Sequence, residues 1–156
     1  MSEPPSLRRA TASDAAAVRA LTRAAYAKWV PLIGREPKPM TADYERAAAE
    51  HRIDLWEEGG ELLALVETIP APDHLLIENL AVRPDQQGKG LGDRLLRHAE
   101  CLAASLGVAE VRLYTNAVFA ANLAFYARRG YAECRRDELG PGRIVVHMRK
   151  RIGPAR

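Results

Sequence analysis

The chain has 156 residues, of which 47% are hydrophobic and 28% charged. These values are ordinary for a globular protein that builds one core without metals or disulfides. No apolar run approaches the roughly 20 residues that a membrane-spanning helix requires, so no membrane partner is expected. The first five residues lack the basic start and apolar stretch of a secretory signal, and we therefore expect a cytoplasmic protein.

The formal net charge of +3 is compatible with a polyanionic ligand. A nucleic-acid-binding protein would cluster its basic residues with aromatic ones, whereas here they are scattered, so nucleic acid is not expected as a partner. Cys101 and Cys134 are too few for a disulfide framework, and neither they nor the four histidines show metal-ligand spacing. We expect two buried or half-buried free thiols and no metal.

The predicted elements begin with a short strand at residues 7–10. An amphipathic helix follows, with apolar residues at helical spacing. Pro31 is expected to stop this helix, because proline disrupts a helix interior. A proline-containing loop over 31–40 and a second short helix over 41–51 complete this part of the chain.

A hairpin is predicted next, with strands at 53–57 and 61–68. The turn contains Gly59-Gly60, and two glycines supply the positive φ angles that a tight hairpin turn needs. The following strand, 75–82, is almost continuously apolar, which favours a strand covered on both faces.

The second half alternates helices and strands. A helix opening at a glycine-rich turn carries four leucines on one side and ends at Gly107; they are Leu91, Leu95, Leu102 and Leu106. A strand at 111–115, a helix at 119–129 and a hairpin of 131–139 with 143–150 follow. The order β-α-α-β-β-β-α-β-α-β-β predicts one α/β domain over 1–156 with a twisted, mixed, mostly antiparallel sheet flanked by helices. The tails, about 1–5 and 151–156, are expected to be loose.

The segment Gln86-Gln87-Gly88-Lys89-Gly90-Leu91-Gly92 lies directly between the apolar strand and this helix. Backbone N–H groups at a helix start have no intrahelical partner, and the helix dipole adds partial positive charge. Glycines let an anion approach that backbone closely. The pattern therefore predicts a phosphate-binding loop.

Two common nucleotide motifs do not fit this loop. Asp93 stands where a dinucleotide fingerprint would continue, and no Gly-Lys-Ser/Thr of a P-loop occurs. The strands before the loop are hairpin strands rather than the start of a βαβ unit. A nucleotide-binding oxidoreductase is therefore disfavoured.

Three segments carry a resemblance to a known family. Gln87, Gly90 and Gly92 match the pattern Q/R-x-x-G-x-G/A. The segment Leu80-Ala81-Val82-Arg83-Pro84 is similar to an apolar-A-V-x-P strand, and residues 122–131 are similar to a motif that ends Y-x-x-x-G-F/Y. In this order the segments resemble motif A, its lead-in strand and motif B of the GNAT acetyltransferase superfamily.

The resemblance implies a GNAT-type acyl-CoA N-acyltransferase fold and an enzyme that transfers acetyl from acetyl-CoA directly to an amine. It implies that the backbone of Leu80 and Val82 pairs with the pantetheine arm and helps to polarise the thioester carbonyl. The residues it assigns to cofactor binding are Leu80, Ala81, Val82, Gln87, Gly88, Lys89, Gly90, Leu91, Gly92, Asp93 and Asn122.

The resemblance also implies that Tyr126 protonates the leaving thiolate. Asn122 lies four residues earlier, on the same helix face; the position seven residues before the tyrosine, where the family more often has asparagine, is Phe119. Glu78 is the candidate base for the incoming amine, because it interrupts an apolar strand. The alternative for Glu78 is that it faces a solvated edge or pairs with an arginine. The alternative for Tyr126 is that it packs against the sheet.

The acceptor, a small-molecule or peptide amine, is expected near the first two helices and the closing hairpin. The candidate residues are Tyr26, Trp29, Arg35, Tyr44 and Asn116; Tyr26 and Trp29 can equally be core residues of the first helix. A homodimer is compatible with the resemblance. The rival function is a domain that binds acyl-CoA as a sensor or partner module without turnover.

Overall fold

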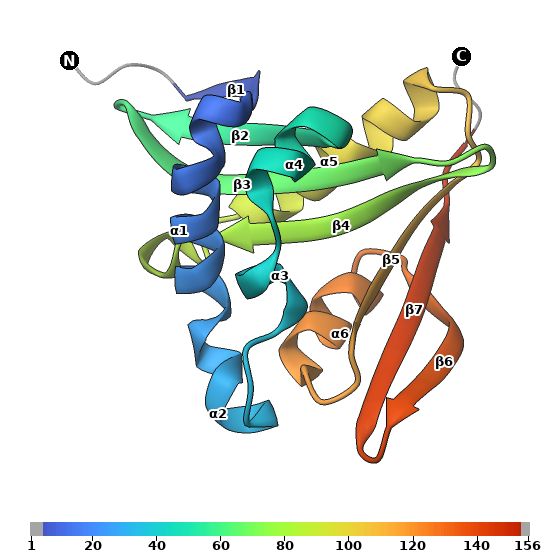
Figure 1. Cartoon of the computed structure of the whole chain (residues 1–156). Helices are drawn as coiled ribbons and strands as arrows, with labels where there is room; N and C mark the ends of the chain where they lie inside the picture. The colour runs from blue at the N-terminus through green and yellow to red at the C-terminus, as the bar shows by residue number, and fades with distance from the viewer. Residues whose placement is uncertain (1–4, 154–156) are drawn as a thin grey trace. The chain divides into compact units, whose positions relative to one another are not determined.

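The computed structural model of the chain describes residues 5–153 (Figure 1). The chain forms two compact units. Unit 1 comprises residues 5–69 and 79–98 of the described chain, and unit 2 comprises residues 70–78 and 99–153. Strand β4 (His74–Val82) and helix α5 (Leu91–Ser105) each contribute residues to both units. The single domain over 1–156 stays a prediction.

Unit 1 combines one end of β4 and the first part of α5 with three antiparallel strands and four further α-helices. These elements are β1 (Ser6–Arg9), α1 (Ala15–Tyr26), α2 (Val30–Ile33), α3 (Lys38–Thr41), α4 (Tyr44–Glu50), β2 (Arg52–Glu58) and β3 (Glu61–Pro70). The strand order is β1-β2-β3-β4, with Leu55 opposite Leu65 in the central antiparallel pair. The β2–β3 turn is confirmed, since Gly59 and Gly60 have φ of 58° and 79°.

Helices α1 and α4 lie on one face of these strands (Figure 1). The face of α1 that carries Val18 and Leu21 packs with Tyr44 of α4 against Ile53 and Leu55 of β2 in one apolar core. Alternation along β2 sends Asp54 and Trp56 to the opposite face. There the first part of α5 covers them, through His98 on Asp54 and Arg94 over the Trp56 ring.

Unit 2 holds the start of β4, the end of α5 and four further elements. These are β5 (Glu110–Asn116), α6 (Ala120–Ala127), β6 (Ala132–Gly140) and β7 (Arg143–Arg151). The strand order is β4-β5-β7-β6. The β4–β5 pair is parallel, and the other two pairs are antiparallel. This confirms a mixed, mostly antiparallel sheet.

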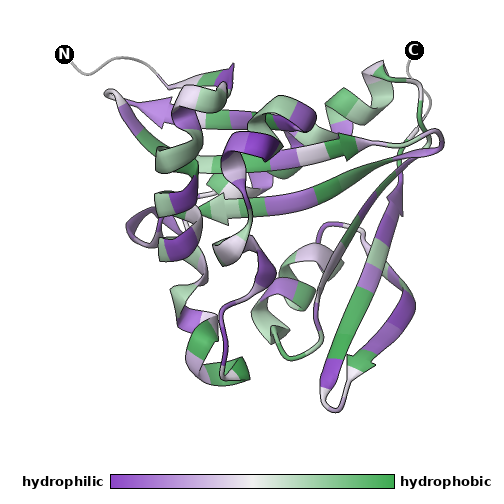
Figure 2. Ribbon diagram, viewed as in Figure 1, coloured by the Kyte–Doolittle hydropathy of each residue, from purple (hydrophilic) through white to green (hydrophobic). Residues whose placement is uncertain are grey.

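The closing hairpin of unit 2 is uneven in polarity. Figure 2 shows β6 as largely hydrophilic and the middle of β7 as hydrophobic. Val146 and Met148 of β7 are buried, whereas most of the β6 residues are exposed. Strand β6 lies at the end of the strand order, and charged residues on an edge strand discourage pairing with other chains.

Two predictions about the first helical region were wrong. Pro31 does not stop a helix; it lies in the first turn of α2, where a proline costs no hydrogen bond. The chain turns instead at Gly34, which has a left-handed φ of 71°. The predicted loop also contains α3, with a proline in its first turn.

The predicted leucine stripe on α5 was only half right. Leu91 and Leu95 are buried, but the other buried residues of the helix are Leu96, Ala99 and Ala103, and Leu102 is only half-buried. Leu106 follows the helix end and is 49% exposed. Strand β4 alternates buried and half-buried residues, so one face is fully covered and the other is partly covered.

The predictions for the thiols and for the C-terminal tail need correction too. Cys101 and Cys134 are both exposed.

Arg151 belongs to β7, and the Ile152 N–H donates to the Ala109 carbonyl at 2.9 Å, so this stretch of the C-terminal tail is not loose. The prediction for residues 1–4 and 154–156 lies outside the described residues. Within the described part, no helix is long and apolar enough to cross a membrane.

Asp54 links β2 to α5 in unit 1. It is 2% exposed, and its carboxylate accepts from His98 Nε2 at 2.9 Å and from Arg52 Nε at 3.0 Å. Burial by itself would raise the pKa of Asp54, but the hydrogen bonds from His98 and Arg52 outweigh it and lower this pKa below its usual range. The ionised carboxylate therefore stabilises the folded state.

We expect Asp54→Asn to lower the free energy of unfolding at neutral pH by about 1–3 kcal/mol, because two donors lose a charged acceptor. The folded-state pKa of Asp54 is depressed, so its contribution is present above the unfolded pKa of about 4 and is lost as the pH falls through the folded value. Urea unfolding from pH 7 to about pH 3 measures this. Asp85→Asn, at an exposed Arg83 pair, should cost much less. If the difference in free energy of unfolding between the wild-type protein and Asp54→Asn grows as the pH falls, the proposed role of the ionised carboxylate is contradicted.

Candidate active site

The loop between β4 and α5 has the backbone geometry that anion binding requires. Gly88 and Gly90 have φ of 81° and 87°, a left-handed conformation that other residues rarely adopt. Nothing lies within 4 Å of a Cβ placed on either glycine, so the space over the loop is open. The 15-residue helix α5 begins at Leu91, and its first N–H groups have no partner within the helix. These residues fit a pyrophosphate group.

The side chain of Gln87 connects this loop to β4 and to Lys28 through two hydrogen bonds. Its Nε2 donates to the Val82 carbonyl at 3.0 Å, and its Oε1 accepts from Lys28 Nζ at 3.2 Å. Both Lys28 and Gln87 are exposed. A cation thus lies beside the loop, which favours an anionic ligand there. Asp93 in the first turn of α5 pairs with Arg97 at 3.1 Å.

The backbone of β4 leaves polar groups on the side away from β3. The Arg83 N–H donates to the Leu63 carbonyl of β3 at 2.8 Å. Because backbone groups of successive strand residues point to alternate sides, those of Val82 and Leu80 point away from β3. The side chains alternate as well: Asn79 and Ala81 are buried, and Leu80 and Val82 are half-buried.

Glu78 shares the half-buried face of β4 and belongs to unit 2. Its Oε1 accepts a hydrogen bond from the Tyr114 hydroxyl of β5 at 2.6 Å. The length is that of a charge-assisted O–H···O⁻ bond. The sequence offered a solvated edge or an arginine as alternative environments for this carboxylate; the tyrosine partner was not foreseen.

Tyr126 lies on α6, within an aromatic group of unit 2. Its ring packs edge-on to Phe125 at 5.1 Å and to Tyr131 at 5.8 Å between centroids. Tyr126 is 9% exposed, and this burial raises the pKa of its hydroxyl above the ordinary value. The phenol therefore holds its proton at neutral pH, as a general acid must before it reacts. Asn122, on the same helix, donates to Thr115 Oγ1 at 3.5 Å.

Two of the predicted acceptor residues meet at Asn79, a residue that the sequence did not single out. The Tyr26 hydroxyl donates to Asn79 Oδ1 at 3.0 Å, and Asn79 Nδ2 donates to the hydroxyls of Thr22 and Tyr44 at 3.2 and 3.3 Å. The Tyr44 hydroxyl in turn donates to the Pro39 carbonyl. Asn79 and Tyr44 are 3% and 1% exposed, whereas Tyr26 is half-buried.

The other predicted acceptor residues have local contacts of their own. Trp29 is half-buried with Lys28 Nζ 5.1 Å from its ring centroid, and Arg35 is half-buried after the Gly34 turn. Asn116 ends β5, and its Oδ1 accepts from the Val118 N–H at 3.0 Å, which shapes the turn into α6. Within the described residues, no group of three or more His, Cys, Asp or Glu side chains could hold a metal ion.

Residues 17–131 match the model of the acetyltransferase (GNAT) family, which is well over half of the chain. The chain therefore belongs to this family. The assignment agrees with the glycine loop after β4, with the phenol on α6 and with the order of helices and strands.

Two characterised relatives match shorter stretches. One stretch of 63 residues is 38% identical to streptothricin acetyltransferase of Streptomyces lavendulae and covers 40% of this chain and 33% of that protein. Another, of 74 residues, is 36% identical to S-(2-succino)cysteine N-acetyltransferase of Bacillus subtilis and covers 46% of this chain and 45% of that protein. The chain thus matches less than half the length of each relative.

Solved structures confirm the fold over almost the whole chain. The ribosomal-protein-S18-alanine N-acetyltransferase of Escherichia coli has a TM-score of 0.78 at 23% identity, covering 98% of this chain and 97% of that one. The PaiA N-acetyltransferase of Thermoplasma acidophilum, in complex with coenzyme A, has a TM-score of 0.74 at 15% identity, covering 96% of this chain and 100% of that one. A GNAT acetyltransferase of Elizabethkingia anophelis with acetyl-CoA bound has a TM-score of 0.69 at 15% identity, covering 95% of this chain and 98% of that one.

The buried network around Asn79 makes a testable claim about stability. We expect Asn79→Ala to lower the free energy of unfolding by about 2–4 kcal/mol, because three hydroxyls lose their common partner in the core. Tyr26→Phe is the matched control; it removes one bond at the half-buried end of the network and should cost about 1 kcal/mol. Urea denaturation measures both, and equal losses in the two variants would show that Asn79 does not hold the network together.

Proposed function

We propose that this protein transfers an acetyl group from acetyl-CoA to a primary amine of a small molecule or a peptide. The observation that carries the proposal is the pair of left-handed glycines, Gly88 and Gly90, placed directly between β4 and the start of α5. Anion binding is the use that best explains such open backbone at a helix start. Family membership makes coenzyme A the expected anion.

The donor site is proposed to consist of the loop from Gln87 to Asp93 and the end of β4. The loop N–H groups would bind the pyrophosphate, with Lys28 and Lys89 adding positive charge. The N–H groups of Leu80 and Val82, which point away from β3, would hold the pantetheine and polarise the acetyl carbonyl. A backbone donor aimed at a developing oxyanion contributes about 3 kcal/mol of barrier lowering. Ala81 completes the proposed donor contacts of unit 1; a donor contact of Asn122, which belongs to unit 2, stays a prediction.

Two side chains of unit 2 are proposed to manage the protons. Glu78 takes one proton from the ammonium form of the acceptor, and the freed nitrogen bonds to the acetyl carbon. The carbon–sulfur bond then breaks, and Tyr126 donates its proton to the departing sulfur. The tetrahedral nitrogen loses its second proton, which restores the Tyr126 phenol. The products are an amide and a free thiol, and one proton is released overall.

The acceptor is proposed to meet residues of the first helices of unit 1. Tyr26 has the strongest support, because its half-buried hydroxyl is held by Asn79. Trp29 and Arg35 are also half-buried, and an arginine would suit an acceptor that bears a carboxylate. The Tyr44 hydroxyl donates to the Pro39 carbonyl, so we propose that Tyr44 shapes the acceptor side; a role for Asn116, which belongs to unit 2, stays a prediction. A cytoplasmic location and a homodimer remain predictions.

Binding of the donor tests the loop assignment. Acetyl-CoA at a hundredfold excess over its Kd should raise the melting temperature by roughly 5–10 °C, and NAD should not. Gly90→Ala should abolish this shift, since a Cβ at a φ of 87° distorts the loop. Gly107→Ala is the matched control, with positive φ and open space just after the opposite end of α5. Stabilisation by NAD instead of acetyl-CoA would overturn the assignment.

The acid role of Tyr126 makes a separate prediction. Tyr126→Phe should lower kcat about a hundredfold, because the thiolate loses its proton donor, while the KM for acetyl-CoA changes little. Thiol release followed with a colorimetric disulfide reagent measures both constants. Unchanged kcat would remove Tyr126 from this role. Strong acetyl-CoA binding without thiol release from any amine would favour the sensor or partner module.

A further inference from the structure

Two half-buried side chains meet at the point where the pairing of β4 and β5 ends. The parallel ladder runs from His74 opposite Glu110 to Ile77 opposite Leu113. Glu78 and Tyr114 are the next residue on each strand, and their side chains are joined by the 2.6 Å hydrogen bond. The side-chain bond thus continues the contact between the strands just beyond their last backbone pair.

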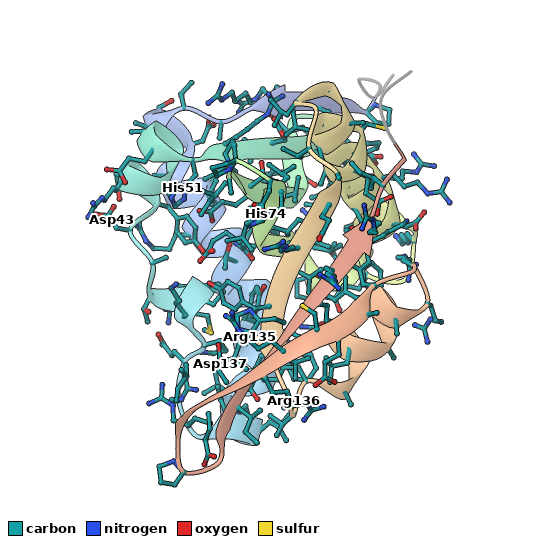
Figure 3. The ribbon with its side chains drawn as sticks, turned by 90° about the vertical axis from the view of Figure 1, so that its right-hand side faces the viewer. Asp43, His51, His74, Arg135, Arg136 and Asp137 are labelled. Carbon is teal, nitrogen blue, oxygen red and sulfur yellow. The ribbon has the colours of Figure 1, made fainter. Side chains whose placement is uncertain are left out.

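Tyr114 is also held from the side of β7. Its partner across the antiparallel ladder is His147, whose ring centroid lies 6.0 Å from that of Tyr114. This separation is within the range of interacting aromatic pairs. His147 Nε2 is in turn 2.9 Å from Asp137 Oδ2 of β6. Figure 3 labels Asp137 and Arg135 on β6, and the Arg135 guanidinium lies 3.2 Å from the same carboxylate oxygen.

The contacts of Tyr114 with Glu78 and His147 give its side chain a defined orientation. Strand β5 fixes its backbone, His147 contacts its ring, and its hydroxyl is directed at one oxygen of Glu78. A phenol that donates to a carboxylate at this distance forms a strong, directional bond. The bond favours one rotamer of the Glu78 side chain and disfavours those that turn the carboxylate away from Tyr114.

We propose that Tyr114 is a positioning residue that holds the Glu78 carboxylate for abstraction of the acceptor proton, an inference that rests on the proposed function. A primary alkyl amine has a pKa near 10 and is protonated at neutral pH. The base must therefore lie within hydrogen-bond reach of the ammonium group, and a misplaced carboxylate loses much of its effect. Tyr114 itself takes no proton and forms no bond in the reaction.

A double-mutant cycle of Tyr114→Phe and Glu78→Gln tests this inference. The substrates are acetyl-CoA with streptothricin, S-(2-succino)cysteine or a peptide that begins with alanine, and thiol release is the readout. Glu78→Gln should lower kcat at neutral pH about a hundredfold, and Tyr114→Phe about tenfold. In the Glu78→Gln background, Tyr114→Phe should lower kcat less than about twofold, because the carboxylate that it positions is gone. The KM for acetyl-CoA should stay unchanged throughout.

Tyr131→Phe is the matched control, because Tyr131 also donates its hydroxyl to a glutamate of unit 2, Glu100, at 2.9 Å. Its effect on kcat should be the same with and without Glu78→Gln. If Tyr114→Phe also lowers kcat equally in both backgrounds, its role is merely structural and the inference is overturned. If Glu78→Gln leaves kcat unchanged, the proposed base is wrong and the inference falls with it.

The four proteins of the double-mutant cycle are the wild-type protein, the two single variants and the double variant. Together they separate a failure of the proposed function from a failure of the inference. No thiol release from the wild-type protein with any of the three acceptors would count against the proposed function. The urea midpoints then decide the inference, since the two substitutions should affect the midpoint less than additively if the Tyr114–Glu78 bond exists in solution. Strictly additive shifts would overturn the inference.

Discussion

Successive side chains of strand β4 point to opposite faces, and this alternation decides which residues of the site can act together. Ile77, Asn79 and Ala81 are buried on one face, while Glu78 and Leu80 are half-buried on the other. The first face anchors the strand to its core and, through Asn79, to α1 and α4. The second face carries the proposed base. A shift of one residue would exchange these roles completely.

Two carboxyl groups are buried on the strands of unit 1, and each forms hydrogen bonds that replace those it would make to water. Asp54 and Glu67 are 2% and 3% exposed, and each has a partner: His98 and Arg52 for Asp54, and His51 for Glu67. Unpartnered, such groups would cost several kcal/mol each. The histidines of this unit therefore stabilise buried carboxylates and tie β2 and β3 to the adjoining helices.

Local patterns predicted the fold well where one interaction dominates. Gly59-Gly60 specified the hairpin because its turn requires positive φ at both positions, and the motifs around Gly90 and Tyr126 identified the family. The prediction failed where proline has two uses, as at Pro31, which begins α2 instead of ending a helix. It also failed at Leu106, where the helix had already ended.

Partners distant in the chain were beyond the sequence. Asn79 and Tyr44 are 35 residues apart, and Glu78 and Tyr114 are 36 apart, so no spacing rule connects them. The only signal was the pair of polar residues, Glu78 and Asn79, inside an apolar strand. A buried polar group needs a partner, but neither residue type names that partner, and only the register between β4 and β5 shows that Tyr114 meets the Glu78 carboxylate.

The measurement that tests the central claim most directly is the mass of the acceptor after incubation with acetyl-CoA and the purified protein. Acetyl-CoA carrying a ¹³C-labelled acetyl group distinguishes acetyl that the protein transfers from unlabelled acetyl that the amine already carries. We predict that the label appears on the amine nitrogen in an amount equal to the thiol released, and that Tyr126→Phe slows both together. Thiol release without labelled amine would indicate hydrolysis of the thioester and would contradict amine acetylation.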